Sequence, residues 1–393
     1  MTESLAHGGA EQNLLSFLRR LPPERFQHHL AYLYPDEGLI EKFRPLVASL
    51  IPLGAGRGPG LLSAAAALQG WMRRHRVDVV HAQLVRAQLV ARAAALAATL
   101  GKGRVPVVTT WQNAFYDDYT VADFGSPARR ALVRRLDAVT GRYDRRFVAV
   151  SEHVATHCCA ALGVPRDKVS VIYNCVEPAR YAPVSPEVLA RTRAELGLAL
   201  EARILLSVGR LVVQKGQRHL IAAMPSVLRQ VPHAVLLIAG GGPLRAELQA
   251  QVSALALGDR VRLLGPRGDV PALYQMADLF AFPSLYEGLS VALVEALANA
   301  LPAVVSDIPQ NREVIEGMGQ GQGQSQGQRM TSVRMVPRED AAALGDAIGE
   351  LLRGGVAVRE AALAARGAVQ LRFSPERLAE RFGQTLEAAA AAG

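Results

Sequence analysis

Short apolar runs alternate along most of the chain with segments whose apolar residues recur at helical spacing. Several runs end in glycine or in polar residues, as strands do where they leave a sheet. The runs predicted to be strands begin at Val77, Pro106, Phe147, Ile204, Val235, Val261, Leu279 and Ala303. Alternating strands and helices predict an α/β protein with parallel, doubly wound sheets.

The length and the proline positions predict two Rossmann-like domains. A chain of 393 residues is long enough for two cores. Pro178, Pro183 and Pro186 suit a linker, so we place an N-terminal domain at residues 1–180 and a C-terminal domain at residues 181–374. Ser374 followed by Pro375 predicts the start of a last helix over residues 375–393.

The N-terminal segment is short for such a fold. Five residues precede Ala6 and contain no β-branched apolar run, whereas a doubly wound sheet has its first strand at the centre. We therefore expect that the sequence begins short of the true N-terminus or that the first strand is degraded. Gly8 and Gly9 predict a loop before a helix that buries Leu14; a plain turn is the alternative, because a lone pair of glycines is weak evidence.

The net charge of +9 indicates an anionic partner. Many arginines gather between Arg129 and Arg146, on one predicted helix and its exit. A solvated helix face explains such a cluster, and so does an anionic membrane surface. We expect no nucleic-acid partner, because no recognised nucleic-acid module accompanies the charge.

Cysteine usage and hydropathy favour a cytoplasmic protein. Three cysteines, two of them adjacent, make no disulfide framework and match no zinc pattern. No run of 18 apolar residues and no basic signal-peptide start is present. We expect a cytoplasmic location, with attachment to the inner face of the membrane as an option.

Candidate chemistry centres on residues 280–295, where an apolar run meets a tight turn and the opening of a helix. Backbone N–H groups of Gly288, Leu289 and Ser290 would surround that helix start, which attracts phosphate. Glu287 and Glu295 can accept hydrogen bonds from paired hydroxyls of a sugar or a ribose. The alternative is that Glu287 is an ordinary acid at a helix start and Glu295 a solvated helix residue.

A second candidate is the loop after the strand that begins at Ile204. Gly209 and Gly216 bracket Arg210 and Lys215, and two cations at a strand end suit a diphosphate leaving group. Solvated surface cations are the alternative. The strand that begins at Val235 also ends in glycines, among them Gly241, but the spacing is not a dinucleotide fingerprint.

Residues 280–307 resemble the E-x7-E motif and flanks of retaining glycosyltransferases with the GT-B fold, the large family 4, group 1 type. The Gly-Arg-Leu and Lys-Gly pattern over residues 209–216 resembles the same family, and the likeness covers nearly the whole chain. It implies two Rossmann-like domains that face a cleft, a last helix that crosses back to the first domain, and metal-independent transfer of a sugar from an NDP-sugar to a carbohydrate or lipid-linked acceptor.

The resemblance also assigns roles to residues. Arg210 and Lys215 would neutralise the departing diphosphate, and Glu287 would hold sugar hydroxyls. Glu295 would hold the ribose. The backbone near Gly209, Gly241, Gly288, Leu289 and Ser290 would approach the donor, as would Gly8 and Gly9. No cofactor and no metal site is expected.

Two residues of the N-terminal half leave the activity open. His81, which we expect at a strand end, would line the cleft or serve a structural role. Where the family usually has a histidine, this chain has Gln112, and an amide cannot take up a proton. A sugar-nucleotide-binding protein without turnover and a sugar-nucleotide epimerase therefore remain alternatives to the transferase.

The segment from Gly317 to Gln328 alternates glycine and glutamine. Such a tract cannot form a core, so we expect a disordered insertion, with an acceptor-side lid as the alternative.

Overall fold

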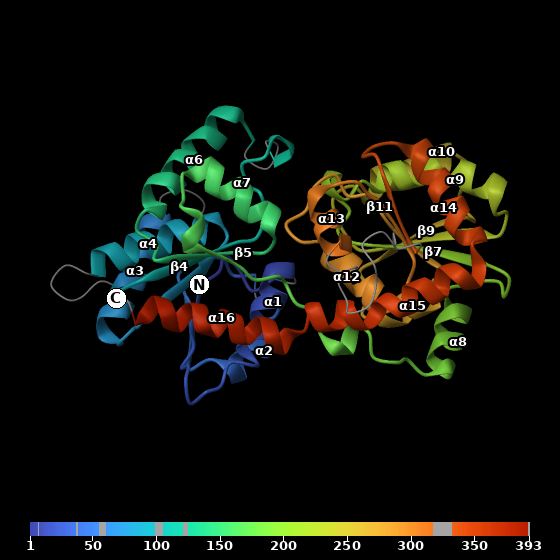
Figure 1. Cartoon of the computed structure of the whole chain (residues 1–393). Coiled ribbons are helices and arrows are strands. Elements are labelled where there is room, and N and C mark those ends of the chain that lie inside the picture. Colours follow the sequence, from blue (N-terminus) through green and yellow to red (C-terminus); the bar gives the residue numbers. More distant parts are fainter. Residues whose placement is uncertain are drawn as a thin grey trace. The chain divides into compact units, whose positions relative to one another are not determined.

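A computed structural model describes residues 1–6, 8–36, 38–54, 60–98, 105–120, 125–316 and 332–391 (Figure 1). The chain divides into two compact units, Met1–Cys175 with Pro375–Gly393, and Val176–Ser374. We call them unit 1 and unit 2. The observed division lies five residues before the predicted boundary at residue 180, and the predicted glycine-glutamine insertion lies outside the described residues.

Unit 1 contains parallel strands in two groups. One is a two-stranded sheet of β1 and β2, and the other is a four-stranded sheet in the order β3-β4-β5-β6. The strands are β1 (His29–Tyr32), β2 (Ser49–Pro52), β3 (Val80–Gln83), β4 (Val107–Trp111), β5 (Arg146–Ala149) and β6 (Val169–Val171). β3 continues two residues beyond His81, where the sequence predicted its end.

Helices of unit 1 begin and end at residues that suit helix termini. Ser126 and Ser151 cap α6 and α7 by accepting backbone N–H bonds, and Gly163 ends α7 in the left-handed conformation. The helices are α1 (Gly9–Leu18), α2 (Ile40–Phe43), α3 (Gly60–Arg74), α4 (Val85–Ala98), α6 (Pro127–Gly141), α7 (Glu152–Leu162) and α16 (Pro375–Ala390). The last helix begins at Pro375, as predicted.

The first three residues lie between the two sheets of unit 1. The amide of Thr2 donates to Ala31 of β1 (3.0 Å), and the amino group of Met1 donates to His81 of β3 (2.6 Å). The amide of Gln83 donates in turn to Met1 (3.1 Å). A short extended segment therefore lies between β1 and β3 and hydrogen-bonds to both.

Unit 2 has one parallel sheet in the order β12-β11-β10-β7-β8-β9. Its strands are β7 (Arg203–Val208), β8 (Ala234–Ala239), β9 (Val261–Gly265), β10 (Leu279–Phe282), β11 (Ala303–Ser306) and β12 (Val333–Val336). When the six strands are numbered by their order in the chain, their order across the sheet from β9 to β12 is 3-2-1-4-5-6. This is the arrangement of a dinucleotide-binding fold. The chain reverses direction across the sheet between β7 and β10, and a sheet of this kind binds its ligand at that switch point.

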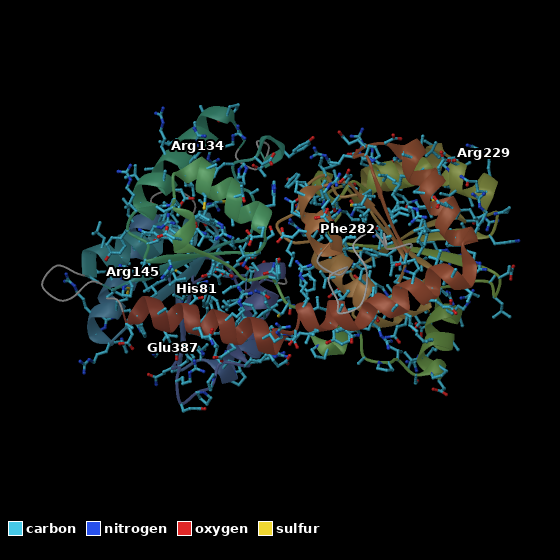
Figure 2. The ribbon with its side chains drawn as sticks, in the orientation of Figure 1. His81, Arg134, Arg145, Arg229, Phe282 and Glu387 are labelled. Atoms are coloured by element: carbon cyan, nitrogen blue, oxygen red, sulfur yellow. The ribbon has the colours of Figure 1, made fainter. Side chains whose placement is uncertain are left out.

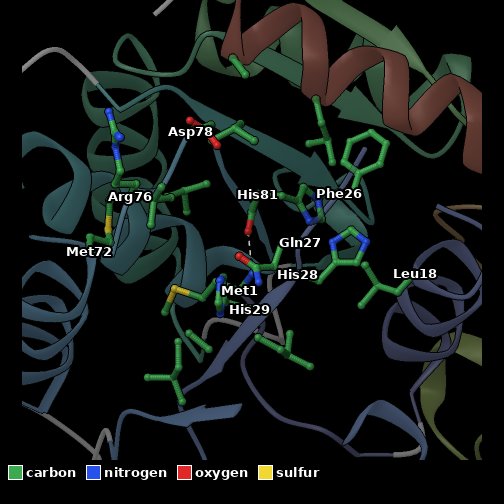
Figure 3. A pocket seen from close by; sticks show the side chains of 18 of the residues that line it. Met1, Leu18, Phe26, Gln27, His28, His29, Met72, Arg76, Asp78 and His81 are labelled. Carbon is green, nitrogen blue, oxygen red and sulfur yellow. Dashed lines mark hydrogen bonds between the residues drawn. The ribbon is translucent and has the colours of Figure 1, made fainter. Parts of the chain in front are cut away.

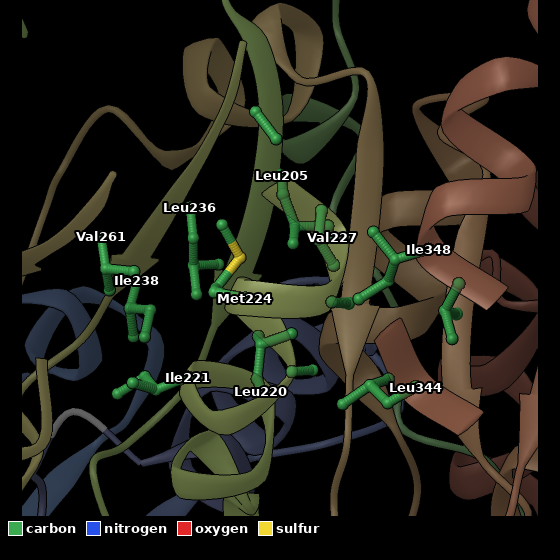
Figure 4. Close-up of a cluster of buried hydrophobic side chains, with 14 of the residues drawn as sticks. Leu205, Leu220, Ile221, Met224, Val227, Leu236, Ile238, Val261, Leu344 and Ile348 are labelled. Carbon is green, nitrogen blue, oxygen red and sulfur yellow. The ribbon is translucent and has the colours of Figure 1, made fainter. Parts of the chain in front are cut away.

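Helices on both faces bury the sheet of unit 2. Apolar side chains of α9, β8 and α14, among them Met224, Leu236 and Ile348, form a continuous core (Figure 4). The helices are α8 (Pro186–Glu195), α9 (Gln217–Gln230), α10 (Arg245–Ala254), α11 (Val270–Met276), α12 (Val291–Ala298), α13 (Pro309–Glu316), α14 (Ala341–Arg353) and α15 (Gly355–Arg372).

Candidate active site

Two loops meet at the switch point of unit 2. One follows β7 and runs from Gly209 to Gly216, and the other follows β10 and runs from Pro283 to Ser290. The amide of Leu285 donates to the carbonyl oxygen of Gln214 (2.8 Å), and the Gln214 side chain donates to the carbonyl oxygen of Tyr286 (2.9 Å). The candidate donor-binding loops therefore form one hydrogen-bonded structure at the carboxyl ends of adjacent strands.

Glycines allow these loops to approach closely. Gly216 has a positive φ of 63°, and a Cβ at this position would overlap the carbonyl oxygen of Pro283. The glycines after β8 pack in the same way, because a Cβ at Gly240 would overlap the carbonyl oxygen of Gly209. Gly241 lies in this turn, and its carbonyl oxygen accepts the amide of Leu211 (2.9 Å). A side chain at Gly216 or Gly240 would push the loops apart.

Lys215 and Glu287 form a largely buried ion pair. The Nζ of Lys215 lies 2.6 Å from Oε1 of Glu287, and the two side chains are 18% and 6% exposed. The ammonium group also lies 5.2 Å from the ring centre of Phe282, which Figure 2 labels. Lys215 is therefore not the solvated surface cation of the alternative interpretation, and the pair joins one loop to the other.

Arg210 lies on the same loop as Lys215 but points to solvent. Its side chain is exposed, and within the described residues no ion pair of its guanidinium group is observed. Its carbonyl oxygen accepts a hydrogen bond from the Gln217 side chain (2.9 Å), which fixes the backbone. The site thus combines a buried cation with an exposed cation that is available to an anionic ligand.

The start of α12 lies beside this pair. The helix begins at Val291, directly after the three residues predicted to surround its start, and the hydroxyl of Ser290 does not cap it. Instead, the Ser290 hydroxyl donates to Oδ1 of the buried Asn311 (2.5 Å), whose amide donates to the carbonyl oxygen of Ser306 (2.8 Å). Gly288 and Leu289 precede this turn. The Ser290 side chain therefore does not cap the first turn of α12, and the amide of Val291 donates to the carbonyl oxygen of Leu289 (2.9 Å).

Glu295 has other partners than the sequence suggested. Arg180 binds both of its carboxylate oxygens (2.6 and 3.2 Å), and the hydroxyl of Tyr274 donates to Oε2 (2.9 Å). The side chain is 12% exposed, so the alternative of a solvated helix residue is wrong. Three hydrogen bonds leave one acceptor position of the carboxylate for a ligand.

Gly8 and Gly9 lie at the start of α1 in unit 1. Gly8 is the residue before the helix and Gly9 is its first residue. The amide of Gln12 donates to the carbonyl oxygen of Gly8 (3.0 Å), and a Cβ at Gly8 would overlap the carboxylate of Glu11. The glycine loop predicted before this helix therefore turns tightly against its first turn.

His81 lies on β3 of unit 1, and Gln112 directly follows the neighbouring strand β4. The Nε2 of His81 is 2.7 Å from the Thr110 hydroxyl, and its ring packs edge-on against Phe382 of α16. Burial, assisted by the amino group of Met1, lowers the pKa of His81 well below its usual value. Gln112 donates to Oε1 of Gln83 (3.2 Å). These contacts give His81 a neutral ring inside the unit.

Several site residues escaped the sequence analysis. Arg180 and Tyr274 hold Glu295, Phe282 borders Lys215, and Asn311 holds Ser290. Phe282 ends the run that was recognised as a strand, so its position next to the turn was a usable signal. Arg180 lies 115 residues from Glu295, and no local pattern connects the two.

Solved structures of glycosyltransferases share this architecture. HepE from Anabaena, solved with UDP-glucose, matches 98% of this chain and 99% of its own with a TM-score of 0.80 and 20% identity. Sucrose-phosphate synthase from Thermosynechococcus elongatus matches 100% and 99%, with a TM-score of 0.79 and 20% identity. The protein therefore has the GT-B fold, as the resemblance implied.

Sequence comparisons give the family. Residues 7–180 match the model described as Glycosyltransferase Family 4, and residues 190–360 match the one described as Glycosyl transferases group 1. Both halves thus point to one family, and the chain belongs to the group 1, family 4 glycosyltransferases.

Individual relatives differ in how much they share. An uncharacterized glycosyltransferase of Methanocaldococcus jannaschii is 36% identical over 174 residues, which is 44% of each chain, so the match spans less than half of that relative. The UDP-Gal:alpha-D-GlcNAc-diphosphoundecaprenol alpha-1,3-galactosyltransferase of Escherichia coli is 26% identical over 321 residues, which is 78% of each chain.

Proposed function

We propose that this protein transfers a sugar from an NDP-sugar to a carbohydrate or lipid-linked acceptor with retention of configuration and without a metal ion. The observation that carries the proposal is the Lys215–Glu287 pair at the switch point of unit 2, with the exposed Arg210 on the same loop as Lys215. Relatives whose names specify alpha-D-GlcNAc-diphosphoundecaprenol and phosphatidylinositol monomannoside support a glycolipid or polysaccharide acceptor.

In this mechanism the protein stabilises the leaving group by charge. As the glycosidic bond breaks, negative charge develops on the diphosphate, and Lys215 with the exposed Arg210 neutralises it. Uncapped N–H groups at the start of α12 add donors to the same phosphate. Glu287, whose Oε1 is held by Lys215, keeps Oε2 as an acceptor for sugar hydroxyls, and Glu295 has one acceptor position for a ribose hydroxyl.

The direct test is donor turnover. UDP-, GDP- and ADP-sugars are screened by thermal shift, and the best donor is incubated with lipid-linked and soluble acceptors in the presence of EDTA. NMR of the product then shows the anomeric configuration. We expect a product with the configuration of the donor and unchanged rates in EDTA; an inverted product or full inhibition by EDTA contradicts the proposed mechanism.

Gln112 favours one alternative, a protein that binds the donor without turning it over. Gln112 hydrogen-bonds to Gln83 and has no group that takes up a proton. Donor binding in the thermal-shift screen with no turnover of any acceptor would support this alternative. An acceptor-free incubation separates the epimerase, because only an epimerase converts the sugar of the donor by itself.

We also propose that α6 attaches unit 1 to an anionic membrane. Leu132, Leu136 and Val139 are 59%, 46% and 63% exposed and recur at helical spacing. Exposed arginines flank this apolar stripe, among them Arg134, which Figure 2 labels. The one carboxylate of the helix, Asp137, is buried against Arg92 (2.5 Å). Within the part of the chain that the structure describes, no helix is long and apolar enough to cross a bilayer.

Vesicle sedimentation tests this attachment. We expect binding to phosphatidylglycerol-containing vesicles, weak binding to pure phosphatidylcholine, and loss of binding in Leu132→Ser/Leu136→Ser. The matched control removes two exposed charges from unit 2, Arg218→Gln/Arg229→Gln, and should bind like the parent. Equal binding of all variants to both vesicles contradicts the proposal.

A further inference from the structure

Helix α15 of unit 2, which Figure 1 labels, has an exposed face that carries large apolar side chains. Its inner face packs against α12 and buries Ala362 and Val369. On the opposite face, Val356, Leu363 and Leu371 are 72%, 59% and 60% exposed. We call this face the α15 stripe, and its exposed positions are Val356, Glu360, Leu363, Ala364, Gly367 and Leu371.

The positions of the α15 stripe are symmetric about its centre. The steps between successive positions are 4, 3, 1, 3 and 4 residues, so the centre falls between Leu363 and Ala364. Two copies of α15 that pack antiparallel about this centre bring Val356 of one copy opposite Leu371 of the other. The same arrangement brings Leu363 opposite Ala364. A two-fold interface needs such a self-complementary surface.

The middle of the stripe has room for the side chains of a second helix. Ala364 and Gly367 are small, and a Cβ added at Gly367 would meet no atom within 4 Å. In the antiparallel arrangement, the stem of Glu360 of the other copy would lie over Gly367, and its Leu363 side chain would lie over Ala364. Small residues therefore face larger ones, as they do where the side chains of packed helices interlock at about 8 to 10 Å.

The charges beside the stripe are complementary in the same arrangement. Glu360 of one copy comes opposite Gly367 of the other, next to Arg366. Glu360 and Arg366 are both exposed, and no ion pair of either is observed among the residues that the structure describes. Because the interface is two-fold, the contact between Glu360 and Arg366 forms twice. Ion pairs of this kind, beside an apolar seam, set the orientation of paired helices.

Glu360 also distinguishes the α15 stripe from the apolar stripe of α6. The one carboxylate of α6, Asp137, is buried, so that helix exposes arginines beside its apolar residues. In the α15 stripe, an exposed carboxylate lies between Val356 and Leu363. It would face the phosphates of an anionic bilayer, which repel it. The stripe therefore favours a protein surface that supplies a cation, and a second copy supplies Arg366.

We propose that the α15 stripe is a dimer interface, and that its occupant is the α15 stripe of a second copy packed antiparallel. The stripe spans about 22 Å, since a helix rises about 1.5 Å per residue. One pair of helices buries less than the roughly 1,600 Å² of a standard interface. We therefore expect a weak dimer, with a dissociation constant of about 10 to 100 μM. No residue of the stripe lies in the candidate donor-binding loops, so this inference is independent of the proposed transfer reaction.

Sedimentation equilibrium of the full chain tests the interface. The parent should pass from monomer to dimer as its concentration rises from about 1 to 500 μM. Leu363→Ser/Leu371→Ser should raise the dissociation constant at least about 30-fold, because four exposed leucines of the dimer no longer become buried. The matched control, Leu132→Ser/Leu136→Ser, removes two exposed leucines from α6 and should dimerise like the parent.

Charge exchange tests the antiparallel arrangement. Glu360→Arg and Arg366→Glu each place like charges at both contacts, so each variant alone should raise the dissociation constant about tenfold or more. An equimolar mixture of the two variants should associate like the parent. In that mixture one chain supplies only cations to the two contacts, and the other supplies only carboxylates.

A parent chain that stays monomeric at about 500 μM overturns the proposal, since the expected dimer would then be fully formed. Equal association of the parent and Leu363→Ser/Leu371→Ser overturns it as well. If the serine variant does not fold, the charge variants decide. A mixture of Glu360→Arg and Arg366→Glu that associates no better than either variant alone also overturns the proposal.

Discussion

The two units have the same winding but differ at the centre of the sheet. In unit 2, β7 pairs with β8 over its whole length and with β10 at Leu205 and Leu206, and the loops after β7 and β10 carry the Lys215–Glu287 pair. In unit 1 the equivalent place holds Met1 to Glu3 and a cavity of about 420 Å³ between β1 and β3 (Figure 3), which we call the β1–β3 cavity. The comparison teaches that a few residues at the carboxyl end of a central strand suffice to position the loop after it, while the rest of the strand supplies packing.

The largest expected effect concerns the buried pair of unit 2. Lys215→Met leaves the carboxylate of Glu287 buried without a cation, which should destabilise unit 2 by about 3 to 5 kcal/mol. Turnover of the donor should fall by about 100-fold or more, because a charge that stabilises the leaving group is lost. Urea unfolding and an initial-rate assay measure the two effects.

The double variant Lys215→Met/Glu287→Leu is the matched control for stability. It replaces the pair by apolar side chains, so stability should return towards the parent value. Turnover should stay low, because neither charge is restored. A double variant with parental turnover would remove Lys215 and Glu287 from the mechanism.

The second prediction compares packing in the two units directly. Leu236 is fully buried in the core of unit 2, and Leu68 lines the β1–β3 cavity. Leu236→Ala should lower the free energy of unfolding of unit 2 by about 2 to 5 kcal/mol. The value should lie near the upper end of this range, because neighbouring side chains surround Leu236 on all sides. Leu68→Ala should cost less, because it enlarges an existing space. Hydrogen exchange of core amides in each unit measures the loss of stability caused by each substitution. Equal losses of stability would mean that the cavity leaves packing unaffected.

The sequence predicted features of local structure and missed contacts between residues that lie far apart in the chain. The start of β10 at Leu279 and the start of α16 at Pro375 matched, because apolar runs and Ser-Pro helix starts report local structure. The Met1–Thr2 segment is too short to show any periodicity. The contacts of Glu295 with Arg180 and Tyr274 join distant parts of the chain, and hydropathy does not encode such pairs.

The third prediction concerns pH and unit 1. The folded protein holds the Met1 amino group at a pKa of about 5, against 8.0 when unfolded. Between these values the unfolded chain binds more protons, so this group makes stability rise with pH from 5 to 8. The change should be on the order of 3 kcal/mol. His28, His29 and His81 also have lowered pKa values and act in the same direction.

Comparison with a form that carries Met-Lys-Gly-Ser-Gly-Ser before Met1 isolates the contribution of the Met1 amino group to this pH dependence. That form keeps the three histidines but replaces the charged nitrogen by an amide. Its stability should vary less between pH 5 and 8 than that of the parent, as followed by urea unfolding at each pH. Parallel curves for the two forms would show that the amino group of Met1 is not desolvated.

The smallest expected effect is at Glu295. Glu295→Gln keeps the size of the side chain and its bond with Tyr274 but weakens the pairing with Arg180, and it offers a weaker acceptor to a ribose hydroxyl. Nucleotide affinity measured by calorimetry should fall about three- to tenfold, or about 1 kcal/mol. Arg180→Gln distinguishes the two roles, because it leaves the carboxylate in place. If Glu295 contacts the ribose, only Glu295→Gln weakens binding strongly; if the two variants lose affinity equally, Glu295 acts through Arg180.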